Sequence, residues 1–226
     1  MFDINLFQYD SANHLGYYKG HLVPSATQLV DIAFPMDSDI PQDRVENAAT
    51  RGTHIHSLVE EINQEFDKSW SYNEDLKQAI GLAIMYNEKE AIDYVSFLKT
   101  YRLKPVVFEK LVFLLDENGD LICYGHLDLI VKAMETINFD EPLFEENKLY
   151  LLDAKTTSLF NKKKTTLQES IYKVAYEQET KKTIDKIFGL WLRDGVKLMP
   201  LKNDHTDSEF VIKICKHLAS IWYDRN

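Results

Sequence analysis

Residues 148–157, KLYLLDAKTT, decide the fold prediction, because they combine an apolar β-strand with two charged side chains at its end. Alternate side chains of an extended strand point to the same face of a sheet. Asp153 and Lys155 are therefore predicted to share one face, while Ala154 turns into the core. A carboxylate beside an ammonium group at a strand end suits metal-assisted hydrolysis of a phosphodiester. The three-residue pattern alone is very common, so by itself it more often marks a surface ion pair without a function.

Strand and helix patterns surround this segment on both sides. Before it, residues 105–134 predict a β-hairpin whose turn carries Asn118-Gly119, a pair that favours tight turns. After it, we expect a helix over 165–183, a second hairpin over 186–201 around Asp194-Gly195, and an amphipathic helix over 208–224. This order predicts an α/β fold with a mixed central β-sheet flanked by helices.

The first half of the chain is predicted to be mainly helical. The first two dozen residues are interpreted as loop or short strand, and Ser25 is the predicted N-cap of a short helix over 25–34. A turn-rich connector over 34–43 leads to longer helices over 45–66 and 73–101, and an acidic loop is expected over 138–147. We interpret 1–226 as one domain, in which 1–104 is an N-terminal helical elaboration and 105–226 forms the sheet with its flanking helices.

Composition limits the classes of protein to consider. A net charge of −10 and a pI of about 5.2 argue against a nonspecific nucleic-acid coat protein. They are compatible with an enzyme that binds DNA in a local basic groove, because carboxylates that hold a metal add to the negative total. Cys123 and Cys215 form no CxxC pair, which predicts neither a zinc ribbon nor an iron–sulfur cluster. Without a secretory leader or an apolar run of about 18 residues, we expect a cytoplasmic protein that does not contact a membrane.

A second acid strengthens the interpretation of the Asp153–Lys155 pair. Asp128 lies within GHLDLIV, an otherwise apolar strand. A carboxylate in such surroundings is costly unless it is paired or binds a metal ion. Backbone amides at a strand end could satisfy it, but Asp153 follows on the next predicted strand. Two carboxylates that meet at one metal ion are therefore the better interpretation.

Two helical segments add candidate ligands and DNA contacts. Gly52 and His56 are four residues apart at the start of a predicted helix, and imidazole is a competent ligand for Mn²⁺. Gln168 and Tyr172 share one face of a later helix and could bind phosphate or a base edge without adding charge. Residues 162–164 are three lysines before that helix, a favourable place for phosphate. Each feature alone also fits a structural residue or a solvated loop.

The features occur in a particular order: GxxxH on a helix, GxxD on a strand, DxK on the next strand, and QxxxY on a helix. In this order the sequence resembles the PD-(D/E)XK nuclease superfamily, and within it the RecB-like branch of phage-type recombination exonucleases. The similarity extends over about residues 24–175. The matching segments are Gly52–His56, Gly125–Asp128, Asp153–Thr157 and Gln168–Tyr172, and Glu109 resembles an additional acid that the branch often carries on the first strand of the hairpin.

The resemblance implies a restriction-endonuclease-like core and a complete site. It implies that Mg²⁺ or Mn²⁺ is bound, without an iron–sulfur cluster, and that ATP is not used, since no GxxxxGK[ST] loop occurs. The implied metal ligands are His56, Asp128, Asp153 and the Ala154 carbonyl; the implied catalytic residues are Asp128, Asp153 and Lys155; the implied DNA-binding residues are Arg51, Lys162, Lys163, Lys164, Gln168 and Tyr172. The expected activity is that of a DNA exonuclease of the recombination or repair type. Its expected partners are DNA ends or single strands, a second copy of the chain, and a single-strand annealing protein.

Two alternatives stay open from the sequence. The same chemistry could serve an endonuclease, because end dependence is determined by how the DNA groove is closed. A catalytically silent DNA-binding or assembly module could retain the fold alone, although the presence of Asp128, Asp153 and Lys155 argues against it.

Overall fold

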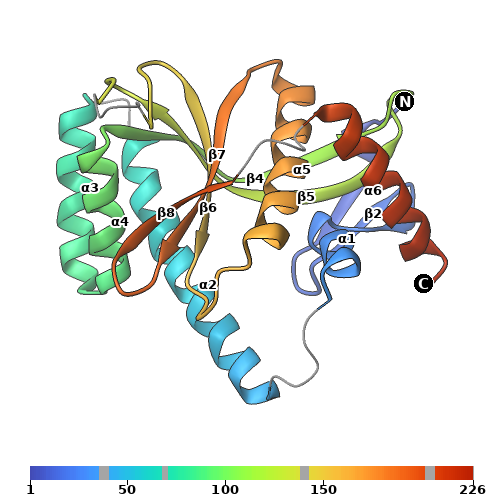
Figure 1. Ribbon diagram of the computed structural model, residues 1–226, viewed down its shortest axis with the longest axis horizontal. Helices are drawn as coiled ribbons and strands as arrows, with labels where there is room; N and C mark the ends of the chain where they lie inside the picture. The colour runs from blue at the N-terminus through green and yellow to red at the C-terminus, as the bar shows by residue number, and fades with distance from the viewer. Residues whose placement is uncertain (36–40, 68–70, 138–142, 202–206, 226) are drawn as a thin grey trace.

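A mixed five-stranded sheet forms the centre of the computed structural model, which describes residues 1–35, 41–67, 71–137, 143–201 and 207–225 (Figure 1). The strand order is β4-β5-β6-β7-β8. The strands are β4 (Leu103–Leu115), β5 (Leu121–Ala133), β6 (Leu149–Lys155), β7 (Ile184–Leu192) and β8 (Val196–Leu201). Neighbouring strands are antiparallel except for β6 and β7, which are parallel. The predicted α/β class, the mixed sheet and its two hairpins are therefore confirmed.

Helix α5 (Lys162–Thr180) makes the crossover between the parallel strands β6 and β7. Parallel neighbours need such a connection, because a tight turn cannot return the chain to the start of the next strand. Pro105 is tolerated in β4 because this strand is at the edge of the sheet, where one row of N–H groups has no ladder partner.

Helices cover both faces of the sheet (Figure 1). One face packs against α2 (Gln42–Gln64), α3 (Tyr72–Tyr86) and α4 (Lys89–Thr100), and the short 3-10 helix η2 (Glu65–Asp67) follows α2. The other face packs against α1 (Ala26–Ala33), α5 and α6 (Ser208–Tyr223). Strand β6 contributes to both cores, because Leu152 and Ala154 point to the first and Leu151 to the second. By alternation, Asp153 and Lys155 are on the side of α5.

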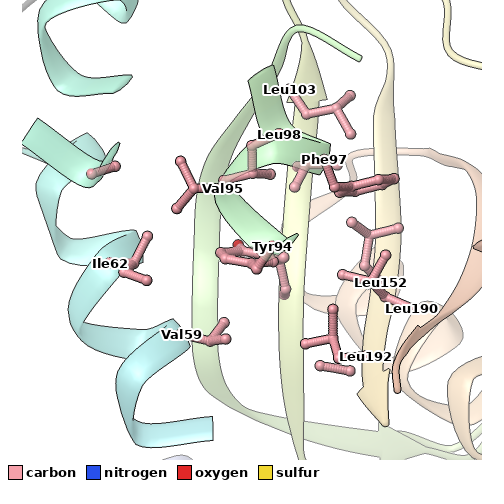
Figure 2. Packing of buried hydrophobic residues seen from close by; sticks show 14 of the residues in the cluster. Val59, Ile62, Tyr94, Val95, Phe97, Leu98, Leu103, Leu152, Leu190 and Leu192 are labelled. Carbon is pink, nitrogen blue, oxygen red and sulfur yellow. The ribbon is translucent and has the colours of Figure 1, made fainter. Parts of the chain in front are cut away.

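The first core fixes the position of α2 relative to the sheet. Figure 2 shows Val59 and Ile62 of α2 facing residues of α4, with Leu152, Leu190 and Leu192 of the sheet beyond them. The buried Tyr94 hydroxyl of α4 donates to Asn63 Oδ1 of α2 at 2.5 Å, which satisfies two polar groups that would otherwise be costly in a core. Because His56 is two helical turns before Asn63, this packing also determines where His56 lies.

A separate three-stranded antiparallel sheet is formed by β1 (Phe7–Asp10), β2 (Leu15–Tyr18) and β3 (His21–Val23), after the 3-10 helix η1 (Ile4–Leu6). It packs on the β4–β5 hairpin, where the ring of Phe7 lies 4.8 Å from that of Phe113 and 5.2 Å from that of Tyr124. The prediction of loop or short strand for this region is thus confirmed as strand. The aromatic side chains of this small sheet therefore lie beside β5.

The prediction of one helix over 73–101 is wrong. Helix α3 ends at Tyr86 and α4 begins at Lys89. Between them Asn87 has a φ of 54°, the left-handed conformation that closes many helices, and its N–H donates to the carbonyls of Ala83 and Ile84. The apolar spacing continues across the break because both helices contribute to the same core.

The other predicted helices are found close to their expected bounds. Ser25 caps α1, and Gln28 completes a reciprocal capping box. The connector and acidic loop predicted over 34–43 and 138–147 fall partly on 36–40 and 138–142, outside the described residues. In the part of the chain that is described, no helix combines the length and apolarity needed to cross a bilayer.

Candidate active site

Three side chains from three elements converge beside β6. They are His56 of α2, Glu109 of β4 and Asp128 of β5, and one ligand atom from each lies within 4.8 Å of the other two. Imidazole and carboxylate groups at this spacing can bind one divalent cation. Of the metal ligands that the resemblance implies, His56 and Asp128 thus lie together. Glu109, expected only as an additional acid, lies with them.

Glu109 adopts an unusual backbone conformation. Its φ is 45°, which is rare for a residue other than glycine and costs energy within a strand. The flanking pairs Phe108–Leu129 and Lys110–Leu127 bring Glu109 opposite Asp128 across the β4–β5 ladder. Burial and the Asp128 carboxylate raise the pKa of Glu109 to about 7. The fold therefore brings two acids together at an energetic cost, and a bound cation would offset that cost.

The backbone of Ala154 connects these ligands to β6. His56 Nε2 lies 2.9 Å from the Ala154 carbonyl oxygen, and the Ala154 N–H donates to Asp128 Oδ2 at 3.1 Å. His56 Nδ1 lies 3.8 Å from the same Asp128 oxygen. The carbonyl implied as a metal ligand is thus adjacent to the His56 ring.

Asp153 and Lys155 form a close ion pair on the face of β6 opposite Ala154. Lys155 Nζ donates to Asp153 Oδ1 at 2.6 Å, and Asp153 is only 1% exposed. Burial raises the pKa of Asp153 to about 6, although Lys155 lowers it. Burial lowers the pKa of Lys155, but the carboxylates of Asp153 and Asp128 outweigh this and hold it above its usual value. Lys155 is therefore a cation at neutral pH.

Glu169 is a site residue that was not predicted from the sequence. It lies on α5, is fully buried, and neither of its oxygens is reached by a donor group of the described residues. Burial, followed by the Asp153 and Asp128 carboxylates, raises its pKa well above the usual value. A signal was available: helical spacing places Glu169 on one stripe with the buried Thr165, Tyr172 and Tyr176.

The residues present fit Mg²⁺ or Mn²⁺. Besides the three converging ligand atoms, the buried Oδ2 of Asp153 faces the Glu169 carboxyl group within hydrogen-bonding reach, and no donor group of another described residue bonds to it. The region holds the carboxyl groups of Glu109, Asp128, Asp153 and Glu169 with Lys155 as the cation beside them. Oxygen donors with an unsatisfied negative charge are what a hard divalent cation binds, and one imidazole is also compatible with Mn²⁺. Asp153 lies outside the group of ligand atoms within 4.8 Å, next to Lys155.

Gln168 and Tyr172 connect α5 to this region. Gln168 Nε2 donates to the Tyr172 hydroxyl at 3.0 Å. Tyr172 is only 2% exposed, and its ring packs directly on the backbone of Gly125. A Cβ atom at position 125 would lie 2.3 Å from Tyr172 Cε1, far inside contact distance. Gly125 of the GxxD segment and Tyr172 of the QxxxY segment therefore contact each other directly.

Replacing Gly125 with alanine is expected to lower the free energy of unfolding by about 1–3 kcal/mol, because the added methyl group must displace the Tyr172 ring. Urea unfolding measures the change. Gly81→Ala is the matched control: position 81 is exposed on α3 with open space around it, so this variant should gain up to about 1 kcal/mol. Equal stability of the Gly125→Ala variant and the wild type would contradict the contact.

The three lysines form the first turn of α5, which corrects the prediction that they precede the helix. Asn161 is the N-cap, and its side chain accepts from the N–H of Lys164. Lys164 pairs with Asp31 of α1 at 2.5 Å, whereas Lys162 and Lys163 are exposed. The helix begins earlier than expected because Asn161 supplies the cap that the apolar spacing does not reveal. Arg51 is exposed on α2 and pairs with Glu90 of α4.

A cavity of about 600 Å³ lies between α1, α5 and the segment after β6. Lys155, Lys164 and Gln168 are among its lining residues, together with the N-cap Asn161. Each of the two lysines is already paired with a carboxylate, so the feature of this cavity that favours an anionic ligand such as phosphate is the N-terminus of α5. A scan against protein-family models and a search of curated proteins found no match to this chain.

Proposed function

We propose that the protein is a divalent-metal-dependent DNA nuclease with a restriction-endonuclease-like core, most similar in design to RecB-like exonucleases of recombination and repair. The observation that carries the proposal is the convergence of His56, Glu109 and Asp128 beside the Asp153–Lys155 pair. These residues come from α2, β4, β5 and β6, so their meeting is a product of the tertiary fold. Three further candidate ligands beside the DxK pair favour a metal site over a functionless surface ion pair.

The chemistry that fits the site is hydrolysis of a phosphodiester, in which water adds across a P–O bond. His56, Glu109, Asp128 and Asp153 would hold the cation, which when bound stabilises negative charge on the phosphate oxygens. Lys155, kept protonated and oriented by Asp153, would donate to a phosphate oxygen or orient the attacking water. Gln168 lines the neighbouring cavity and is fixed by Tyr172, so it would position the strand.

DNA as the substrate is supported by the local distribution of charge. The chain as a whole is acidic, but Lys155 and Lys164 line the 600 Å³ cavity, and Lys162 and Lys163 are exposed at the same helix end. Such a local cluster can bind a phosphate backbone despite an unfavourable net charge. The preference for DNA ends, the second copy that would close the groove, and a single-strand annealing partner rest on the resemblance to the RecB-like branch.

The test is a digest of linear duplex, single-stranded and closed circular DNA with Mg²⁺, Mn²⁺ or EDTA. We expect both metals to support degradation of the linear substrates, EDTA to stop it, and the closed circle to resist. Cutting of the circle would replace the exonuclease proposal with an endonuclease. Intact DNA in every metal condition would overturn the nuclease proposal.

A pair of variants separates the site from contaminating activity. Asp153→Asn removes the buried charge that holds Lys155 and should abolish the cleavage. Asp224→Asn, at an exposed position at the end of α6, is the matched control and should cleave like the wild type. Equal cleavage by both variants would assign the activity to another protein or another site.

A further inference from the structure

We infer that a second cavity, between the small N-terminal sheet and α1, is a binding subsite for one nucleobase of the DNA strand whose phosphate lies at Lys155. This inference rests on the proposed function and adds a specific contact to it. The cavity has a volume of about 450 Å³, within the range of small-ligand sites, and it lies between β1, the β1–β2 turn, α1, β5 and α5.

The chemistry of its walls differs from that of the lysine-lined cavity. Its lining contains no lysine, arginine, aspartate or glutamate among the described residues. A phosphate or a metal ion would therefore find no opposite charge there. The walls carry histidine, tyrosine and side-chain amide groups. Such walls suit a ligand that is flat, aromatic and rich in neutral donors and acceptors.

An aromatic surface is present on the side of the small sheet. The Tyr9 ring lies 4.8 Å from the His126 ring and 5.9 Å from the Tyr124 ring, and its hydroxyl lies 3.0 Å from His14 Nδ1. The Tyr124 hydroxyl donates to the His14 carbonyl at 2.9 Å, which anchors the β1–β2 turn on β5. The rings are thus held in place before any ligand arrives, as a stacking surface for a base requires.

Unused hydrogen-bonding groups face the same cavity. Gln28 uses its Oε1 to accept from the Ser25 N–H, which leaves its amide NH₂ as a donor. Gln168 uses its Nε2 on Tyr172, which leaves its carbonyl oxygen as an acceptor. The imidazole ring of His126 also lines the cavity and can donate through one nitrogen and accept through the other. A donor, an acceptor and an imidazole around one space complement the edge of a base.

The two cavities share some of their lining residues. Thr27 and Gln168 line both, while Lys155 lines only the first and His126 only the second. His126 also precedes Asp128 by two positions on β5, on the strand that supplies a metal ligand. A phosphate beside Lys155 and a base against Tyr9 would therefore occupy neighbouring cavities that share Gln168, as the two parts of one nucleotide could.

The experiment is an abasic scan of a short single-stranded oligonucleotide. Its affinity for the full-length protein is measured by fluorescence anisotropy, with Ca²⁺ in place of Mg²⁺ and one abasic site moved along the strand. We expect one position at which removal of the base weakens binding about tenfold, and small effects elsewhere. A uniform response at all positions would overturn the inference.

Variants then assign that position to the cavity. In His126→Ala and in Tyr9→Leu, which removes the aromatic ring but keeps an apolar side chain, the tenfold penalty of the abasic site should shrink, because the base has already lost its contact. His21→Ala changes an exposed histidine of β3 in the same small sheet, outside the cavity, and should keep the full penalty. A full penalty in all three variants would place the base elsewhere on the protein.

This inference and the nuclease proposal can fail separately. A protein that cleaves DNA but has no sensitive position would refute the base subsite alone. A protein with a sensitive position that depends on His126, but without cleavage in Mg²⁺ or Mn²⁺, would refute the nuclease proposal and retain the subsite. Absence of binding to any oligonucleotide would refute the subsite.

Discussion

Replacing Lys155 with alanine is expected to lower the rate of DNA cleavage about a thousandfold while DNA binding persists. The ammonium group is the cation held against Asp153 at 2.6 Å, and in the proposed mechanism it would act where negative charge develops during hydrolysis. Loss of one such preorganised donor typically costs 10²- to 10³-fold in rate, about 3–4 kcal/mol of transition-state stabilisation. Single-turnover cleavage of an end-labelled linear duplex measures the effect.

The Lys155 experiment needs a control for stability, because alanine leaves Asp153 buried without its partner. Lys155→Gln retains a donor for Asp153 Oδ1 but carries no charge, so it should fold well and still be inactive. Lys213→Ala removes an exposed lysine of α6 and should cleave normally. Cleavage by the Lys155→Gln variant at the rate of the wild type would show that the ammonium group is not needed.

Asp128→Asn is expected to abolish both cleavage and the stabilisation of the fold by Mn²⁺. The asparagine side-chain oxygen can still accept from the Ala154 N–H, so the fold is preserved while the charge that faces Glu109 and His56 is lost. In the wild type, Mn²⁺ at 100 times its dissociation constant should add about 2.7 kcal/mol to the free energy of unfolding. Urea unfolding with Mn²⁺ and with EDTA measures that gain in each variant.

Removal of the metal ion with EDTA provides a second test of the Asp128→Asn variant. Without metal, Asp128 is repelled by Glu109 but attracted to Lys155, so the two losses in the Asp128→Asn variant offset each other and its stability in EDTA should be close to that of the wild type. Asp224→Asn should show the full Mn²⁺ gain. An undiminished gain in Asp128→Asn would mean that the ion binds at another site.

The elements with strong periodicity were predictable from the sequence. The hairpin of β4 and β5, strand β6 and helix α6 each carry a clear period and a recognisable turn or cap, and local physics determines them. The break at Asn87 was missed because the apolar spacing runs through it on both sides. The bounds of α5 were missed because the cap at Asn161 lies outside the apolar stripe.

The candidate site was only partly accessible from the sequence. The order of segments indicated His56, Asp128, Asp153 and Lys155, but the strained conformation of Glu109 has no local signature. Of the residues that line the proposed nucleobase subsite, Gln168 and Tyr172 were predicted as DNA contacts, whereas Tyr9 and His126 were missed for the same reason. Tyr9 and His126 are more than a hundred positions apart, and only the packing of the small sheet on β5 brings their rings to 4.8 Å.

The contact between His56 and the Ala154 carbonyl joins residues 98 positions apart. A contact between residues so far apart forms only after a large loop has closed, and closing the loop costs conformational entropy. Such contacts are therefore expected to form late in folding. During synthesis on a ribosome, a chain that ends before β6 contains His56, Glu109 and Asp128 but lacks the Ala154 backbone that bonds to His56 and Asp128. The proposed nuclease activity would therefore be delayed until synthesis has passed β6, because shorter chains also lack Asp153 and Lys155.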